Sequence, residues 1–233
     1  AFEAACGYDL IAVLPALQDV DHPDHVRVSH DFGRVRYAAF CEAFERPIAS
    51  WCRAHGLAYS GEKPALRLSQ LRWMDIPGCE PGHTKAGANP DWLQARIRSN
   101  AKATASAATF YGKEGALCEC YHSTGWSATL QDAKLIADGL LLAGIRYLVP
   151  HGYFYTTHAL KKHDAPPTFF FQMPFWPLFG ELSAHVERIA KVFEGTHIDA
   201  EILVVDPGGG LLTHEDPANH PYLQAYEDLL WAL

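Results

Sequence analysis

The sequence predicts an α/β protein of the (β/α)8 TIM-barrel type. Short apolar segments alternate with amphipathic helices, and strands joined through helices pair in parallel by right-handed crossovers. Three successive predicted strands end in the polar side chains Glu62, Glu119 and His151, and barrel enzymes carry their chemistry at this edge. An open doubly wound sheet also fits the alternation. No G-x-G-x-x-G turn stands between a strand and a helix, which favours the barrel.

The composition is that of a globular protein with a sizeable core: 233 residues, of which 48% are apolar and 20% charged. The net charge of -8 provides no basic field for a polyphosphate backbone, so nucleic acid is not an expected partner. No apolar run is long enough to span a bilayer and no export signal is visible, so no membrane association is expected. The 6 cysteines form no C-x-x-C pair, which favours reduced thiols and a cytoplasmic location.

The first regular elements are a long helix and a short strand. The helix is expected from about 31 to 55, with apolar residues along one side, a kink at Pro47 and an end at Gly56. The strand is expected at 57–61 and leads directly to Glu62.

A second strand is expected at 71–76, followed by a Gly/Pro-rich loop over 77–89. Asn89-Pro90 is a good helix start, because proline is favoured at the first helical position. This helix is expected to run to about Tyr111.

The next strand is expected at 115–120, and the following helix is expected to begin after Thr129 and to end at Gly144. Asp132 stands three residues after Thr129, which is a variant of the capping box. These are local signals that do not depend on the rest of the fold.

The remaining elements are expected to be a strand at 145–150, an aromatic and histidine-rich loop, a helix at about 178–194 and a strand at 200–207. We therefore expect residues 1–198 to form the catalytic barrel portion. Residues 199–233 are expected to begin a following α/β domain or to form a C-terminal extension.

The segment ALCECYHSTGW, 116–126, suggests the first catalytic group. Side chains alternate along a strand, so Cys118 and Cys120 face one side and Glu119 the other. This alternation argues against a metal site that combines the thiols with the carboxylate. We predict that Glu119 is a catalytic carboxylate, with an ion pair to an arginine or lysine as the purely structural alternative.

Glu62 is predicted to be the second carboxylate. Glycoside hydrolysis needs two carboxyl groups, one protonated as the acid and one ionised as the base or nucleophile. Asp75 and Glu80 compete for the same role, and an ion pair between Glu62 and Lys63 is an equally consistent reading.

Aromatic residues gather in the loops that follow the strands, where they could pack on the apolar faces of sugar rings. The residues expected to bind substrate are Trp73, Asp75, Tyr121, His122, Trp126, His151, Tyr153 and Trp176. The histidines show neither H-x-H nor H-E-x-x-H, so a zinc site has little support, and no G-x-S-x-G elbow indicates a serine hydrolase.

Two long runs resemble a known family: CECYHSTGWSATLQDAKLIADGLLLAGIRYLVPHGYFYT and KKHDAPPTFFFQMPFWPLFGELSAHVERIA. They resemble the later barrel strands of large glycoside hydrolases similar to the α-L-rhamnosidases of glycoside hydrolase family 106. The shared pattern is a strand that ends in Glu, a Gly-Trp loop, a Pro-His-aromatic strand end and an aromatic run before Trp-Pro. The resemblance covers about 115–206, and 7–17 resembles an earlier loop of the same proteins.

The resemblance implies that the chain holds the later part of a barrel and cleaves O-glycosidic bonds in a poly- or oligosaccharide. It aligns Glu119 with the strand-end glutamate, His151 with the Pro-His histidine and Trp176 with the aromatic run. It also implies that calcium can bind near the site, although no ligands can be assigned, and the residues themselves indicate no cofactor. The opening Ala1-Phe2-Glu3, without methionine, fits a piece of a longer protein.

One departure from the family pattern affects the acid. Related families show an Asp-x-Pro-Glu-like segment where this chain has Asp75-Ile76-Pro77-Gly78. If the family's acid is that glutamate, this chain either lacks it or uses Glu80.

The sequence thus predicts a glycoside hydrolase in which Glu119 and Glu62 are the acid and the base or nucleophile. The stereochemistry is left open, and the family resemblance leans toward inversion. Two alternatives stay open. One is a metal-dependent barrel hydrolase that uses His122, His151 and His163, and the other is a non-catalytic carbohydrate-binding barrel. The sequence defines no oligomeric state.

Overall fold

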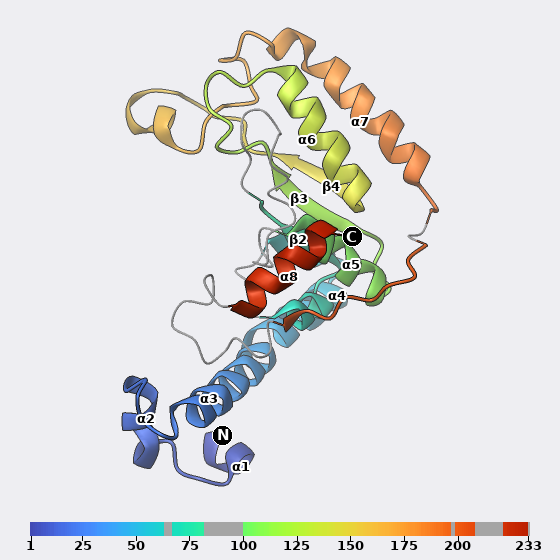
Figure 1. The fold of residues 1–233 in the computed structure, drawn as a ribbon. Coiled ribbons are helices and arrows are strands. Elements are labelled where there is room, and N and C mark those ends of the chain that lie inside the picture. The colour runs from blue at the N-terminus through green and yellow to red at the C-terminus, as the bar shows by residue number, and fades with distance from the viewer. Residues whose placement is uncertain (63–66, 82–99, 197–198, 208–220, 233) are drawn as a thin grey trace.

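The computed structural model describes residues 1–62, 67–81, 100–196, 199–207 and 221–232. Within them the chain is a mixed α/β protein built around a four-stranded parallel sheet (Figure 1), which confirms the predicted α/β class. The strands are β1 (Ser60–Glu62), β2 (Ile76–Cys79), β3 (Ala116–Cys120) and β4 (Ile145–Pro150), and they lie side by side in chain order.

Helices pack against this sheet and extend beyond it. The α-helices are α1 (Phe2–Cys6), α2 (Leu14–Gln18), α3 (His25–Phe40), α4 (Arg46–Ala54), α5 (Ala101–Phe110), α6 (Leu130–Ala143), α7 (Phe179–Phe193) and α8 (Pro221–Ala232). Short 3-10 helices lie at Ile11–Val13, Leu68–Trp73, Ala159–His163 and Trp176–Leu178. In Figure 1, α1, α2 and the start of α3 project away from the sheet, whereas α6 and α7 pack side by side.

The predicted long helix begins earlier than expected, at His25, and continues to Ala54 through a π-helical turn at Cys41–Glu45. Pro47 follows directly, in the first turn of α4. Proline has no amide hydrogen and its ring crowds the carbonyl one turn earlier, and a wide turn at that point relieves both problems. The helix therefore passes Pro47 without ending.

The second predicted strand was placed wrongly. Residues 68–73 form a 3-10 helix, and β2 begins only at Ile76. Leu71 and Met74 are three residues apart and both are buried, which is a helical spacing. Pro77 and Gly78, expected in a loop, belong to β2, because a Cβ at Gly78 would lie 2.6 Å from the Gly61 carbonyl oxygen and only glycine lets β1 approach this closely.

Two other elements differ from the prediction. α5 begins at Ala101, where the Asn100 side chain accepts a hydrogen bond from the Ala103 amide, and residues 82–99 of the predicted loop and helix lie outside the described residues. The strand predicted at 200–207 is wrong, since residues 199–207 form no strand. The division into parts at residue 198 stays a prediction.

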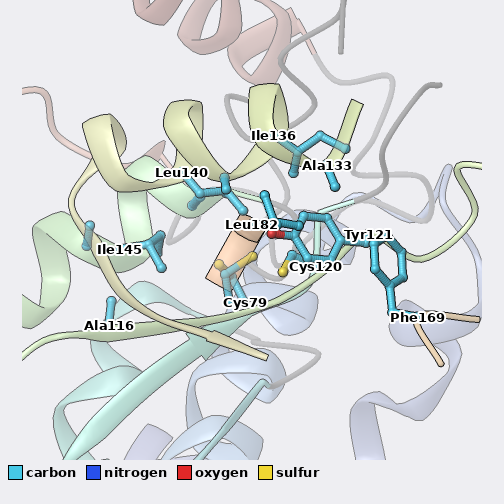
Figure 2. Packing of buried hydrophobic residues seen from close by; sticks show 14 of the residues in the cluster. Cys79, Ala116, Cys120, Tyr121, Ala133, Ile136, Leu140, Ile145, Phe169 and Leu182 are labelled. Carbon is cyan, nitrogen blue, oxygen red and sulfur yellow. The ribbon is translucent and has the colours of Figure 1, made fainter. Parts of the chain in front are cut away.

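The core lies between one face of the sheet and the helices. Cys79, Cys118 and Cys120 are fully buried there and pack against small and apolar side chains of α5 and α6. Figure 2 shows Ile136 and Leu140 of α6 facing this layer. The predicted alternation in β3 is confirmed, and so is the capping box of Thr129 and Asp132 at the start of α6.

Candidate active site

The carboxyl ends of the four strands form one edge of the sheet, and the register decides which side chains meet there. Glu62 pairs with Gly78, Gly78 pairs with Leu117, and Glu119 pairs with Val149. Register partners point to the same face of a sheet. Glu119 therefore projects from the face opposite the buried cysteines, and its side chain is 33% exposed.

Glu119 and His151 form the first pair at this edge. Glu119 Oε1 lies 4.0 Å from Nδ1 of His151. The backbone amide of His151 donates to the Cys120 carbonyl at 2.8 Å. This hydrogen bond extends the β3–β4 ladder by one residue and fixes the backbone from which the His151 side chain projects. Among the described residues, the buried Nδ1 atom has no hydrogen-bond partner. A small movement would bring this nitrogen within hydrogen-bond distance of the Glu119 carboxylate.

Glu80 and His122 form the second pair, with Glu80 Oε1 3.7 Å from Nε2 of His122. The same nitrogen lies 2.9 Å from the Pro81 carbonyl oxygen. Because a carbonyl only accepts hydrogen bonds, Nε2 carries the hydrogen in this contact. The ring centroids of His122 and His151 are 6.0 Å apart. These four residues, Glu80, His122, His151 and Glu119, are called the Glu–His cluster below.

The register also decides which of the two candidate carboxylates, Glu80 or Glu62, lies closer to Glu119. Glu80 stands two residues after Gly78, and Glu119 stands two residues after Leu117, the partner of Gly78. The register continued by one residue past Cys79 and Cys118 places Glu80 level with Glu119 on the neighbouring strand end. Glu62 is level with Gly78, so it lies one strand further from Glu119 and about two residues short of it. Glu80, not Glu62, is the carboxylate next to Glu119.

The loop after β3 is held in a fixed shape. Tyr121 and Ser123 have φ angles of 77° and 62°, a left-handed conformation that is costly for these residues and gathers at functional sites. The Gly125 amide donates to the Pro166 carbonyl at 2.9 Å, and Nε1 of Trp126 donates to the Lys162 carbonyl at 2.7 Å. The loop is thereby tied to the loop after β4.

Aromatic rings continue the surface beside the cluster. The Phe154 ring lies 5.9 Å from that of His151. The neighbouring Tyr153 is 58% exposed and packs edge-on against Trp176 at 6.1 Å. Trp176 stacks on Phe179 at 5.5 Å. The structure therefore brings the predicted residues Tyr153 and Trp176 together, in the segment that follows β4.

Three predicted substrate contacts are not at this site. Tyr121 is 2% exposed and stacks on Phe169 at 4.7 Å within the core, and burial raises its pKa. Its positive φ turns the side chain away from the face that strand alternation would give it. Trp73 and Asp75 precede β2 and so lie at its amino end, where the Asp75 carboxylate accepts a hydrogen bond from the Tyr59 amide.

The histidines were also predicted as possible metal ligands. Within the part of the chain that the structure describes, no three His, Cys, Asp or Glu side chains gather in a way that could hold a metal ion. His163 is exposed on its 3-10 helix. The calcium implied by the family resemblance stays a prediction, to which no ligands are assigned.

The role of Glu80 was the main point that the sequence left undecided. Glu80 directly follows β2, Glu119 is the last residue but one of β3, and His122 stands two residues after β3. That position was visible in the sequence, but the β2 boundary and its register with β3 were needed to interpret it.

Comparisons with protein-family models, curated proteins and solved structures found no match to this chain. Among the described helices, none combines the length and the apolar character needed to cross a membrane.

Proposed function

We propose that this chain forms part of a (β/α)8-barrel glycoside hydrolase, and that Glu119 and Glu80 are its two catalytic carboxylates. The observation that carries the proposal is the level placement of these two residues at neighbouring strand ends, each beside a histidine. The barrel is supported by four parallel strands in chain order, since an open nucleotide-binding sheet reverses its strand order near the first strand.

The burial of the two carboxylates suggests their roles. The Glu80 side chain is 16% exposed and that of Glu119 is 33% exposed. Removal from water favours the neutral carboxylic acid, so the more buried group is better suited to donate a proton to the leaving oxygen. Glu119 is then assigned the role of nucleophile or base, with His151 beside it.

The substrate proposed is an oligo- or polysaccharide. Tyr153, two residues after His151, is exposed and adjoins Trp176, and aromatic faces pack well against the C–H faces of sugar rings. A rhamnoside is the first substrate to test, because of the family resemblance.

A panel of aryl glycosides, with an aryl α-L-rhamnoside among them, tests the proposal on the full-length protein. Glu119→Gln and Glu80→Gln should each lower kcat/KM by about 100-fold or more, the range expected for loss of an acid or base. Glu62→Gln is the matched control and should stay within about tenfold of the parent. Circular dichroism would establish that each variant is folded, and a chelator should leave the activity unchanged.

Different outcomes separate the parts of the proposal. A large loss in Glu62→Gln with little loss in Glu80→Gln would restore Glu62 as the partner of Glu119. Full activity in Glu119→Gln would refute the assignment of the site, and hydrolysis of no glycoside would refute the function.

A further inference from the structure

A pocket of about 540 Å³ lies at the opposite edge of the sheet from the Glu–His cluster. It is bounded by the C-terminal halves of α5, α6 and α7 and by the segments that enter β3 and β4. In Figure 1 these helix ends meet on the side of the sheet where β3 and β4 begin. The pocket therefore shares no residue with the candidate active site.

Most of the pocket wall is apolar. It is formed by Ala105, Ala108, Leu141, Leu142, Val192 and Phe193. Leu142 is 71% and Val192 69% exposed, so water reaches the wall. A volume of this size is typical of sites for small organic molecules, which span about 300–1,000 Å³ and combine apolar walls with a few polar groups.

The polar groups at the pocket are mainly cationic. The guanidinium of Arg146 donates to Thr196 Oγ1 at 3.4 Å, and its Cζ lies 5.9 Å from the Phe193 ring centroid. Lys113 is the second cation that lines the pocket. Among the residues that the structure describes, no carboxylate lies within ion-pair distance of Arg146 or Lys113. Glu114, also at the pocket, accepts a hydrogen bond from the Tyr147 hydroxyl.

The absence of a side chain at Gly115 leaves room for the side chain of Arg146. A Cβ at residue 115 would lie 2.7 Å from Cγ and 2.9 Å from Cβ of Arg146. The glycine therefore leaves the space that the arginine side chain occupies at the start of β3.

The C-terminal ends of the three helices repel an anion in the pocket, but this repulsion is weaker than the attraction from Arg146 and Lys113. A helix C-terminus carries about half a negative charge, which acts only over its last turn. Here the final carbonyls already accept hydrogen bonds, from the Gly144 amide in α6 and from the Thr196 amide and hydroxyl in α7. Arg146 and Lys113 each carry a full charge and can donate directly to a ligand.

We infer that this pocket binds a small organic carboxylate with an apolar body, which places its carboxylate on Arg146 and Lys113 and its body against the wall formed by α5, α6 and α7. The inference does not depend on the proposed glycosidase activity.

Isothermal titration calorimetry with 4-phenylbutyrate tests this inference on the full-length protein. A ligand of this size is expected to bind with a dissociation constant of about 1 mM or tighter. The alcohol 4-phenylbutan-1-ol has the same body without the charge and should bind at least about tenfold more weakly. The cation 4-phenylbutylamine should bind more weakly still.

Arg146→Gln and Lys113→Gln should each weaken 4-phenylbutyrate binding by about tenfold. Arg188→Gln removes the same charge from an exposed position of α7 outside the pocket and should change nothing. If Arg146→Gln fails to fold, Lys113→Gln decides the test. No binding, equal binding of acid and alcohol, preference for the amine, or equal loss in Arg188→Gln would each overturn the inference.

Discussion

Nε2 of His185 lies 2.6 Å from Oδ1 of Asp138, and this contact joins α7 to α6. Lys134 donates to the other carboxylate oxygen of Asp138 from one helical turn away. Burial acts to raise the pKa of Asp138, but the hydrogen bonds from Lys134 and His185 outweigh it and hold the pKa below its ordinary value. The carboxylate thus connects the two helices that cover the core at β3 and β4.

Asp138→Asn should lower the free energy of unfolding by about 1 kcal/mol at pH 7, because a charge-assisted hydrogen bond at a partly exposed site is lost. A carboxylate with a depressed pKa stabilises the fold above its unfolded pKa of about 3.9, and the gain disappears as the pH falls through the folded value. Urea unfolding at pH 7 and at pH 3 should therefore show the parent and the variant converging in acid.

Glu187→Gln is the matched control for this experiment, since Glu187 pairs with Lys191 on the surface of α7 alone. It should change the stability little at either pH. A difference between Asp138→Asn and the parent that persists in acid would contradict the role given to the charge.

Gly78→Ala should destabilise the protein by about 2 kcal/mol or more. The added Cβ would meet the backbone of β1 at 2.6 Å from the Gly61 oxygen and 2.9 Å from the Glu62 nitrogen, and backbone atoms cannot move aside without separating the strands. Gly180→Ala in α7 meets nothing within 4 Å and should be neutral or slightly stabilising. Thermal unfolding of both variants checks this, and equal midpoints would contradict the close approach of β1 and β2.

Tyr59→Phe should cost about 1–3 kcal/mol, because a buried oxygen of Glu45 would lose its hydrogen-bond donor. The Tyr59 hydroxyl donates to Oε2 of Glu45 at 2.7 Å, and Glu45 is fully buried in the π-helical turn. Burial, followed by this hydrogen bond, raises the pKa of Tyr59. Tyr155→Phe alters a 95% exposed ring and is the control. Chemical denaturation measures both, and a loss below about 0.5 kcal/mol in Tyr59→Phe would argue against the buried contact.

The proposed enzyme should act with retention of configuration. Carboxyl groups about 5–5.5 Å apart give a covalent intermediate and retention, whereas about 6.5–9.5 Å leaves room for water and gives inversion. The level placement of Glu80 and Glu119 on neighbouring strand ends favours the shorter separation, although the family resemblance led us to expect inversion. The anomer released first, followed by proton NMR, distinguishes the two, and initial release of the inverted anomer would support Glu62 as the partner.

The sequence alone determined the features that depend on near neighbours. Thr129 and Asp132 cap α6 as expected, and β3 turns Glu119 away from Cys118 and Cys120. Both follow from backbone geometry over a few residues, which any surrounding fold must respect.

The tertiary structure decided what depends on distant contacts. The close approach of Gly78 to β1 and its register with Leu117 brought Glu80 level with Glu119, and the positive φ of Tyr121 directed its ring into the core. A shift of one residue in register reverses the face of every side chain in a strand, and long-range packing alone selects the register. For this reason the sequence could predict the face to which Glu119 points, but only the fold could show which carboxylate stands beside it.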